Sequence, residues 1–469
     1  MFKLTYQHIL GVAFTLLIIT AVGAYSGKKV KTASDFSVGG KKASSAIVAG
    51  TIMGTLVGGA STIGTAQLSF LYGFSAWWFT LGAGIGCLIL ALFFTGPLYR
   101  SEKETIPQIL SEEFGGLAKP ISSVFISVGI FLNIIAQILA AMALITSMFK
   151  INPLIAAIIA IALMSAYVIF GGVWGTGLVG VAKLILLYIS VIIGGIMAIR
   201  CGGGIGQFTS YFPKDPYFSL FGRGFLIDGG ACFSLILGVL STQTYIQAVL
   251  SGKTLQDSKT GALISAFLIP PIGIAGIFIG LFMKMNYPNI DPATAFPQFV
   301  LNYMNPWLGG VVMATLLIAV VGTGAGLSLG ISTILTKDIY KNYINKKAED
   351  SKLLNVSRSI IILTLILALT FTTGNMKSLI LKWSFMSMGL RGATVFAPLC
   401  AALFMKGKVK SNFAIASMIL GPISVILGKM ILPQNIDPLF LGILISLIFI
   451  VLGKLACSDK PTIENKSSL

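Results

Sequence analysis

The chain has 469 residues, of which 55% are hydrophobic and only 10% are charged. This composition excludes a soluble globular protein and indicates an all-α protein that crosses a membrane many times. The formal net charge of +18 does not indicate a nucleic-acid partner, because the basic residues lie in short loops between apolar segments. The cysteines are scattered and His8 is the one histidine, so the sequence predicts neither a disulfide framework nor a histidine metal site.

Apolar stretches long enough to cross a bilayer follow one another along the whole chain. A spanning helix needs about twenty apolar residues, and this rule predicts about thirteen helices. The expected spans are 7–25, 44–70, 74–98, 120–149, 153–171, 175–199, 227–250, 259–284, 309–336, 357–374, 378–405, 412–432 and 437–456. The positive cluster that follows the first stretch favours a retained span over a cleaved signal peptide.

Lysine and arginine are divided unevenly between alternate loops. The loops around 100–119, 337–358 and 406–410 are rich in them, whereas the loops on the other side carry few. The positive-inside rule places the basic loops in the cytoplasm. We therefore expect a multi-pass protein of the plasma membrane with its N-terminus outside, its C-terminus in the cytoplasm and an odd number of spans.

The second expected span is unusually rich in small and hydroxyl-bearing residues. It contains Gly54, Gly58, Gly59, Gly64, Ser61, Thr62 and Thr65. Glycine weakens a helix, and uncovered backbone persists inside a membrane only where protein encloses it or where it lines a polar cavity. Many secondary transporters build their ion and substrate sites from broken helices of this kind. We expect such a site here; the alternative is a glycine-lined contact between two helices.

A second candidate break lies five spans later, between Ile227 and Gln243, in a segment that enters the membrane from the opposite side. Interrupted spans at matching positions of two inverted repeats indicate a binding site between the repeats. The predicted substrate-binding residues are Gly58, Gly59, Ser61 and Thr62 at the first break, Gly238, Ser241 and Gln243 at the second, and Arg391.

Two basic residues, Lys183 and Arg391, are expected near the middle of their spans. A basic residue at a helix centre costs about 2.5–3.5 kcal/mol on the insertion scale. The acidic residues lie in loops or at span ends and do not offset that cost. A lysine can give up its proton, whereas an arginine remains charged. Lys183 is therefore a candidate proton carrier and Arg391 a candidate partner for a substrate carboxylate. The alternatives are snorkelling for Lys183 and, for Arg391, packing against carbonyl groups of a neighbouring broken helix.

An ordered set of motifs resembles the sodium:solute symporter family, which includes proline, galactose and choline transporters. The matching segments are Asp35–Gly40, Val57–Ala66, Gly171–Trp174, Gln243–Lys253 and Ser332–Tyr340. The resemblance covers nearly the whole chain and implies a leucine-transporter-like core of five plus five helices in inverted repeats, with two broken helices. The divisions expected are 1–43 (first helix and cytoplasmic loop), 44–200 (first repeat), 201–406 (second repeat) and 407–469 (two peripheral helices and a short cytoplasmic tail).

The resemblance also implies a sodium site between the broken second span and the ninth span. Its ligands, transferred by position, are the backbone carbonyl groups of Gly54, Val57 and Ala319 and the side chains at 322 and 323. Thr323 supplies a hydroxyl group there, whereas Gly322 supplies none.

The sixth span departs from the same family pattern. Members often have an Asp there with a Gln three residues later, and this chain has Gly180 and Lys183. One acid beside the ion path is therefore replaced, and a base is introduced.

These features predict a symporter that couples a cation, sodium by resemblance, to the transport of a small organic solute by alternating access. The alternative is proton-coupled or uncoupled transport in which Lys183 replaces the sodium ion. A transporter-like sensor is a further alternative. An enzyme is not expected, because the interiors of the spans lack the Asp, Glu or His that acid–base chemistry in the bilayer would need. No cofactor is predicted beyond the coupling ion, and the expected partners are the bilayer and a solute, for which a carboxylate is one candidate.

Overall fold

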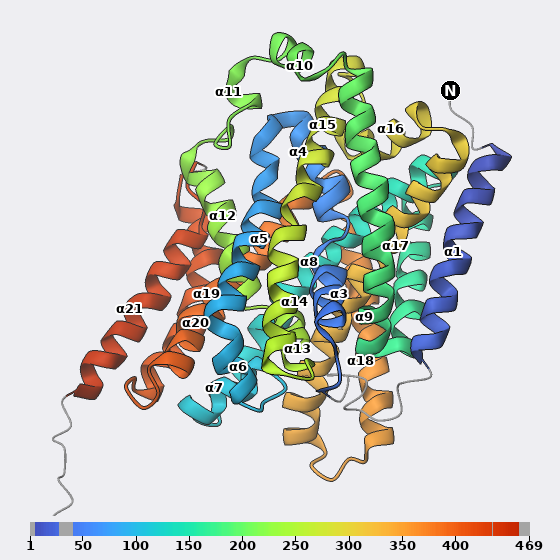
Figure 1. Cartoon of the computed structure of the whole chain (residues 1–469). Coiled ribbons are helices and arrows are strands. Elements are labelled where there is room, and N and C mark those ends of the chain that lie inside the picture. The colour runs from blue at the N-terminus through green and yellow to red at the C-terminus, as the bar shows by residue number, and fades with distance from the viewer. Residues whose placement is uncertain (1–4, 28–40, 434, 459–469) are drawn as a thin grey trace, which may run out of the picture.

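The computed structural model describes residues 5–27, 41–433 and 435–458. Within these ranges the protein is all-helical, and its one β contact is an isolated bridge between Ala43 and Gly252. The long helices lie side by side in a single bundle (Figure 1). Nine of the described helices are long and apolar enough to cross a membrane, or ten when the bent pair α12–α13 counts as one span. Shorter apolar helices occupy three more of the expected spans, and the total of about thirteen stays a prediction.

The elements in chain order are α1 (Tyr6–Gly27), α3 (Ser45–Leu56), η2 (Ala60–Gly64), α4 (Thr65–Tyr72), η3 (Gly73–Trp77), α5 (Trp78–Ile89), η4 (Leu90–Phe94), α6 (Thr95–Arg100), α7 (Ile106–Phe114), α8 (Ala118–Phe149), α9 (Pro153–Cys201), α10 (Ile205–Tyr211), α11 (Lys214–Tyr217), α12 (Phe225–Leu240), α13 (Gln243–Leu250), α14 (Leu255–Leu268), α15 (Pro270–Asn286), η5 (Pro292–Thr294), α16 (Ala295–Tyr303), α17 (Pro306–Ile334), η6 (Leu335–Ile344), α18 (Asp350–Thr373), α19 (Ile380–Phe404), α20 (Ser411–Ile431) and α21 (Leu439–Ser458).

The second expected span is interrupted in its middle. Helix α3 ends at Leu56, Val57 has an extended backbone, and helical structure resumes at Ala60 with the π-helical turn η2. Two of the backbone N–H groups released by the break are bonded to side chains. The N–H of Gly58 donates to Ser61 Oγ (2.9 Å) and that of Gly59 to Gln137 Oε1 (2.8 Å). The unwound backbone is thus satisfied by protein groups, as a low-dielectric interior requires.

The second interruption separates α12 from α13. The two helices differ in direction by 41° at Ser241 and Thr242. Thr242 closes the end of α12, because its hydroxyl donates to the carbonyl oxygen of Gly238. The break therefore lies near the middle of the expected span 227–250, within the segment that the sequence singles out.

Helix α9 contains both the fifth and the sixth expected spans. It is helical over 49 residues. Two of its side chains, one from each expected span, show that its first and second sections lie at the same level of the bundle. A Cβ added to Gly322 would lie 3.4 Å from the hydroxyl of Tyr167 and 3.8 Å from Nζ of Lys183. In a straight helix these two residues would be about 24 Å apart along the axis. The sections before and after 170–179 therefore both contact α17 beside Gly322.

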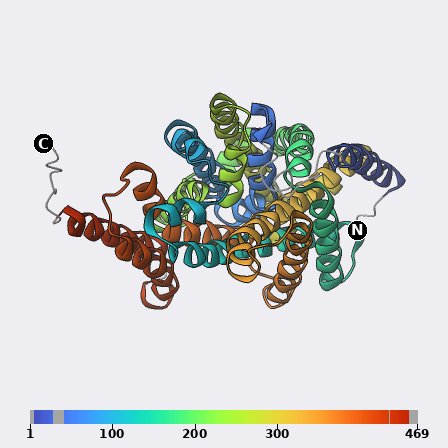
Figure 2. The same cartoon turned by 90° about the horizontal axis from the view of Figure 1, so that it is seen from below.

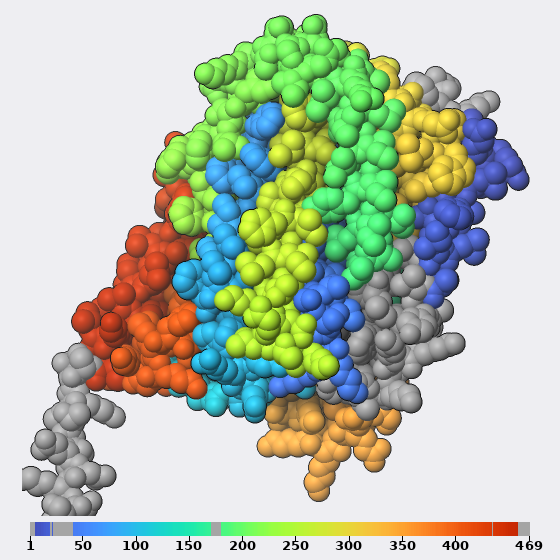
Figure 3. Space-filling model, in the orientation of Figure 1, coloured from blue at the N-terminus to red at the C-terminus, as the bar shows by residue number. Residues whose placement is uncertain are grey.

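The outermost helices lie at opposite edges of the bundle. Seen from below, α21 is at one edge and α1 at the other (Figure 2). Short helices around α10 cover one end of the molecule, whereas α14, α5 and the second section of α9 form much of the face shown in Figure 3. Residues 35–40, which carry one of the family motifs, lie outside the described ranges, as do the side chains of Gly171–Trp174. The division into the four expected segments stays a prediction.

Candidate functional site

The ammonium group of Lys183 lies against the broken end of α3. Nζ donates to the backbone carbonyl oxygen of Gly54 at 2.7 Å, to that of Ala319 at 3.1 Å and to Thr323 Oγ1 at 3.2 Å. The lysine is 1% exposed. Its three acceptors belong to the set of groups that the family resemblance assigns to a sodium ion. The side chain therefore reaches inward to the break and does not snorkel to the membrane surface.

Thr323 joins the unbroken helix α17 to the same break. Its hydroxyl lies 3.1 Å from the carbonyl oxygen of Gly54 and 3.2 Å from that of Val57. Both oxygens are at the C-terminal end of α3, where the last carbonyl groups of a helix lack intrahelical partners. Together Lys183 and Thr323 satisfy carbonyl groups that the unwinding leaves free.

Gly322, the expected ligand position without a hydroxyl group, faces the two sections of α9. Tyr167 OH and Lys183 Nζ are the atoms nearest to the place that a Cβ at this residue would occupy. The hydroxyl of Tyr167 is thus close to the site, although the sequence did not single this residue out. A tyrosine in an apolar span is a common feature, so no sequence signal distinguishes it.

The backbones of α9 and α3 touch one turn before the Lys183 contact. A Cβ added to Gly180 would lie only 2.3 Å from the carbonyl oxygen of Gly50, a distance that real Cβ atoms do not tolerate. Glycine at 180 permits this approach, and the next turn of each helix then brings Lys183 beside Gly54. The two departures in the sixth span are therefore parts of one arrangement.

The predicted substrate residues of the first break are buried and bonded mainly to one another. Ser61 Oγ and Thr62 Oγ1 both lie within hydrogen-bonding distance of the carbonyl oxygen of Gly58, at 3.0 and 2.9 Å. Gly58 and Gly59 are closely enclosed: a Cβ would lie 2.4 Å from Thr323 Oγ1 at the first and 2.2 Å from Ala140 Cβ at the second. These residues shape the break, and direct contact with a solute stays a prediction.

Gln137 and Asn133 on α8 extend the polar surface of the first break. Gln137 Nε2 donates to Asn133 Oδ1 (3.3 Å), which also accepts from Ser384 Oγ (2.9 Å). The chain of bonds links α8 to α19 and, through Gly59, to η2. Sequence reasoning missed these residues, although two amides four positions apart in an apolar span are a detectable signal.

Arg391 is 0% exposed and lies beside the second break. Its guanidinium donates to Thr242 Oγ1, to Ser387 O (3.0 Å) and to Ser387 Oγ (2.8 Å). None of the described carboxylates is within ion-pair distance of it. It thus contacts a hydroxyl that itself bonds to the end of α12, and a carbonyl oxygen of its own helix. Its charge has no counter-ion among the described residues.

Three hydroxyl groups near the second break are buried without a hydrogen-bond partner in the described part of the chain. They are those of Ser241, Thr244 and Tyr245. Unsatisfied buried hydroxyl groups are costly and call for an explanation such as a ligand or an ordered water.

Gly238, another predicted substrate residue, is packed against Met388. A Cβ added to Gly238 would lie 2.5 Å from the Cβ of Met388.

Gln243 differs from the other predicted substrate residues in where its side chain points. Its amide accepts from the N–H of Ile106 (2.9 Å) and donates to the carbonyl oxygen of Glu104 (2.9 Å). It therefore fixes the loop before α7 to the start of α13. A role of Gln243 in substrate binding stays a prediction.

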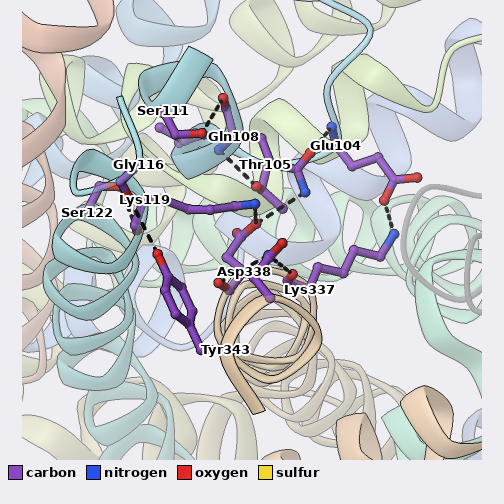
Figure 4. A network of polar contacts seen from close by, with 12 residues as sticks. Glu104, Thr105, Gln108, Ser111, Gly116, Lys119, Ser122, Lys337, Asp338 and Tyr343 are labelled. Carbon is purple, nitrogen blue, oxygen red and sulfur yellow. Dashed lines mark hydrogen bonds and ion pairs between the residues drawn. The ribbon is translucent and has the colours of Figure 1, made fainter. Parts of the chain in front are cut away.

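The same loop joins a polar cluster at this end of the bundle, which we call the α7–η6 network (Figure 4). Asp338 of η6, whose side chain is fully buried, accepts from Gln108 Nε2 (3.2 Å) and lies 3.8 Å from Lys119 Nζ. Lys337 pairs with Glu104. The network thus connects α7 and α8 to η6, the element that follows α17 in the chain.

Comparison with known proteins places these features in a family. The family description "sodium:solute symporter family" matches residues 36–421. The chain is 25% identical to the sodium/glucose cotransporter of Vibrio parahaemolyticus over 78% of this chain and 74% of that protein. It is 23% identical to the sodium/proline symporter of Escherichia coli over 92% and 90% of the two chains. It is also 23% identical to the human sodium/myo-inositol cotransporter 2 over 75% of this chain, and spans only 59% of that longer protein.

Two solved structures share the fold. A substrate-bound, outward-open Na⁺-coupled sialic acid symporter has a TM-score of 0.80 at 17% identity, with 98% of this chain and 99% of that chain covered. Mhp1, a nucleobase-cation-symport-1 family transporter, has a TM-score of 0.61 at 11% identity over 90% and 94% of the chains. Both are leucine-transporter-fold proteins, and at these identities they support the fold alone.

Proposed function

The chain belongs to the sodium:solute symporter family, and from this premise we propose that it transports a small organic solute across the plasma membrane by alternating access. The relatives include symporters for proline and glucose, so a solute of comparable size is the expected cargo. The basic loops, which include the α7–η6 network, would face the cytoplasm, with the N-terminus outside and the C-terminus inside.

The observation that carries this proposal is the bond between Thr323 and the carbonyl groups of Gly54 and Val57. It joins a continuous helix to a broken one at the level where transporters of this type bind their ligands. The contact between α3 and α17 is suited to a conformational switch, because a cation or solute that binds there can favour one relative position of the two helices over another.

The coupling cation has two candidates. Sodium is the ion named for the relatives, and Gly54, Val57, Ala319 and Thr323 offer it four oxygens. The ammonium group of Lys183 already contacts three of these groups, and this argues against sodium at this position. We therefore propose a second candidate function. The protein would transport its solute without sodium at this site, and Lys183 would be the proton-coupling residue.

The solute site would lie between the two breaks. Gly58, Gly59, Ser61 and Thr62 would border it on one side, and the unpaired hydroxyl groups near Ser241 on the other. Arg391 is buried without a described counter-ion and would attract an anionic group. A solute with a carboxylate is therefore our first choice.

Uptake into proteoliposomes tests the transport proposal. Purified protein would be offered radiolabelled proline, glucose, myo-inositol and sialic acid under inward sodium and proton gradients in turn. We expect uptake of at least one solute by the wild type and none by a Gly58→Leu variant that inserts equally well. Fluxes equal to those of empty liposomes for the whole panel under both gradients would contradict the proposal.

A further inference from the structure

We propose that the ammonium group of Lys183 is the resident cation of the site between α3 and α17, and that it excludes sodium from this position. The inference rests on the transport function proposed above, because it identifies the cation of the same site. The chain would then be a sodium:solute symporter family member whose own lysine fills the position that the family resemblance assigns to sodium.

The hydrogen-bonding capacity of the ammonium group is fully used. A lysine ammonium has three N–H donors and no acceptor. The structure provides three acceptors, Gly54 O, Ala319 O and Thr323 Oγ1, at 2.7, 3.1 and 3.2 Å. All three distances are within the normal range for such bonds. The group therefore replaces a metal ion both in charge and in its oxygen partners.

A sodium ion bound to the same oxygens would be a few ångströms from the lysine charge. Like charges at such a separation in a buried site repel strongly. The groups that face Lys183 are neutral. They are the Gly54 carbonyl of α3, a carbonyl and a hydroxyl from α17, and Tyr167 from the first section of α9. The four ion pairs found within the described ranges do not include Lys183. Nothing described here offsets a second positive charge.

The packing around Lys183 depends on the other departures from the family pattern. An Asp at 180 would place its Cβ 2.3 Å from Gly50 O, so the close approach of α9 to α3 excludes the acid that family members often have there. Only this approach brings a side chain at 183 to Gly54. Gly322, in turn, lacks the hydroxyl that would complete a sodium shell. Gly180, Lys183 and Gly322 therefore act together.

Removal of the lysine should convert the position into a sodium site. The double variant Lys183→Ala, Gly322→Ser deletes the ammonium group and supplies the missing hydroxyl. A Cβ at 322 would be 3.4 Å from its nearest neighbour, an ordinary contact, so serine fits. The readout is the melting temperature of the purified protein in NaCl and in choline chloride at equal ionic strength. This measurement needs no solute, so it separates a failure of this inference from a failure of the transport proposal.

We expect the melting temperature of the wild type to be the same in the two salts. That of the double variant should rise by at least about 2 °C in a saturable manner as Na⁺ increases, because an ion that binds only the folded state stabilises it. The matched control is Lys382→Ala, which removes an exposed lysine and should behave as the wild type. A third variant, with Thr323→Val added to the double variant, should lose the sodium response.

Two results would overturn the inference. The first is a saturable sodium stabilisation of the wild type that Thr323→Val abolishes. The second is a double variant that melts cooperatively in choline chloride, and is therefore folded, but gains no response to sodium. If the double variant does not fold, Lys183→Gln, Gly322→Ser is used with the same two salts, and the absence of a sodium response in that folded variant counts against the inference.

Discussion

Gly180 meets the carbonyl oxygen of Gly50 at a distance that leaves no room for a side chain, because a Cβ at 180 would lie 2.3 Å from that oxygen. This contact fixes the separation of α9 and α3. It is the reason that Lys183, three residues later, reaches Gly54 O at 2.7 Å. The position of the lysine charge is thus set by a backbone contact and not by an acidic partner.

The variant Gly180→Ala should displace α9 and weaken the Lys183 contacts. Overpacking of this kind costs about 1–3 kcal/mol, and we expect a lower melting temperature and at least a tenfold loss of solute uptake. The control is Gly206→Ala in α10, where an added Cβ has no neighbour within 4 Å. Unchanged uptake and melting temperature for Gly180→Ala would show that the close approach does not exist in the protein.

A second prediction concerns the effect of side chains at Gly58 and Gly59 of the first break on solute uptake. A Cβ at Gly58 would lie 2.4 Å from Thr323 Oγ1 and 2.7 Å from Gln137 Oε1. Replacing Gly58 and Gly59 together with Leu should therefore separate α17 from the break and abolish uptake, while insertion into the membrane stays intact. Gly96→Ala, which meets nothing within 4 Å, is the control. Normal uptake by the double leucine variant would remove this break from the transport site.

Arg391 provides a test of the charge of the solute. If a carboxylate is its missing counter-ion, Arg391→Gln should raise the Kd for an acidic solute tenfold or more, equivalent to about 1.4 kcal/mol. Binding can be measured by scintillation proximity on purified protein, with Arg391→Lys as the charge-conserving comparison. Equal affinity of wild type and Arg391→Gln, or an uncharged sugar as the transported solute, would contradict a carboxylate-binding role.

Gln243 predicts an effect at the α7 end of the bundle. Its amide makes two 2.9 Å hydrogen bonds to the loop before α7, each worth about 1 kcal/mol. Gln243→Ala should therefore raise amide hydrogen exchange in residues 104–114 severalfold. Gln256→Ala, which removes an exposed glutamine bonded only to Thr260, should leave this exchange unchanged. An unaltered exchange rate in Gln243→Ala would contradict a role of Gln243 in holding this loop.

The sequence predicted the membrane-spanning architecture, the family and the two interrupted helices, because hydropathy and glycine content are local properties. It also placed Lys183 inside an apolar span, and the structure buries this residue in α9. The partners of Lys183 are 129 and 136 residues away in the chain, so spacing and composition could not reveal them. The family resemblance supplied the oxygens of the site and, with Lys183 on the sixth span, the alternative that its ammonium group replaces the sodium ion. The individual hydrogen bonds to Gly54, Ala319 and Thr323 are seen only in the structure.

Other parts of the site were beyond sequence reasoning for related reasons. The hydrogen bonds of Gln243 to a loop nearly 140 residues earlier in the chain could not be predicted from its place beside the second break. Gln137 was not singled out, because its bond to Gly59 depends on how α8 packs against the break. In each case the deciding contact joins elements that are distant in the sequence, and only the packed bundle brings them together.

Solute uptake into proteoliposomes, under a sodium gradient at fixed pH and then under a pH gradient without sodium, tests the central claim most directly. With Lys183 as the resident cation, the wild type should accumulate solute without sodium, and Lys183→Gln should lose that uptake. Uptake by the wild type that depends fully on sodium, and that Lys183→Gln retains, would contradict the claim.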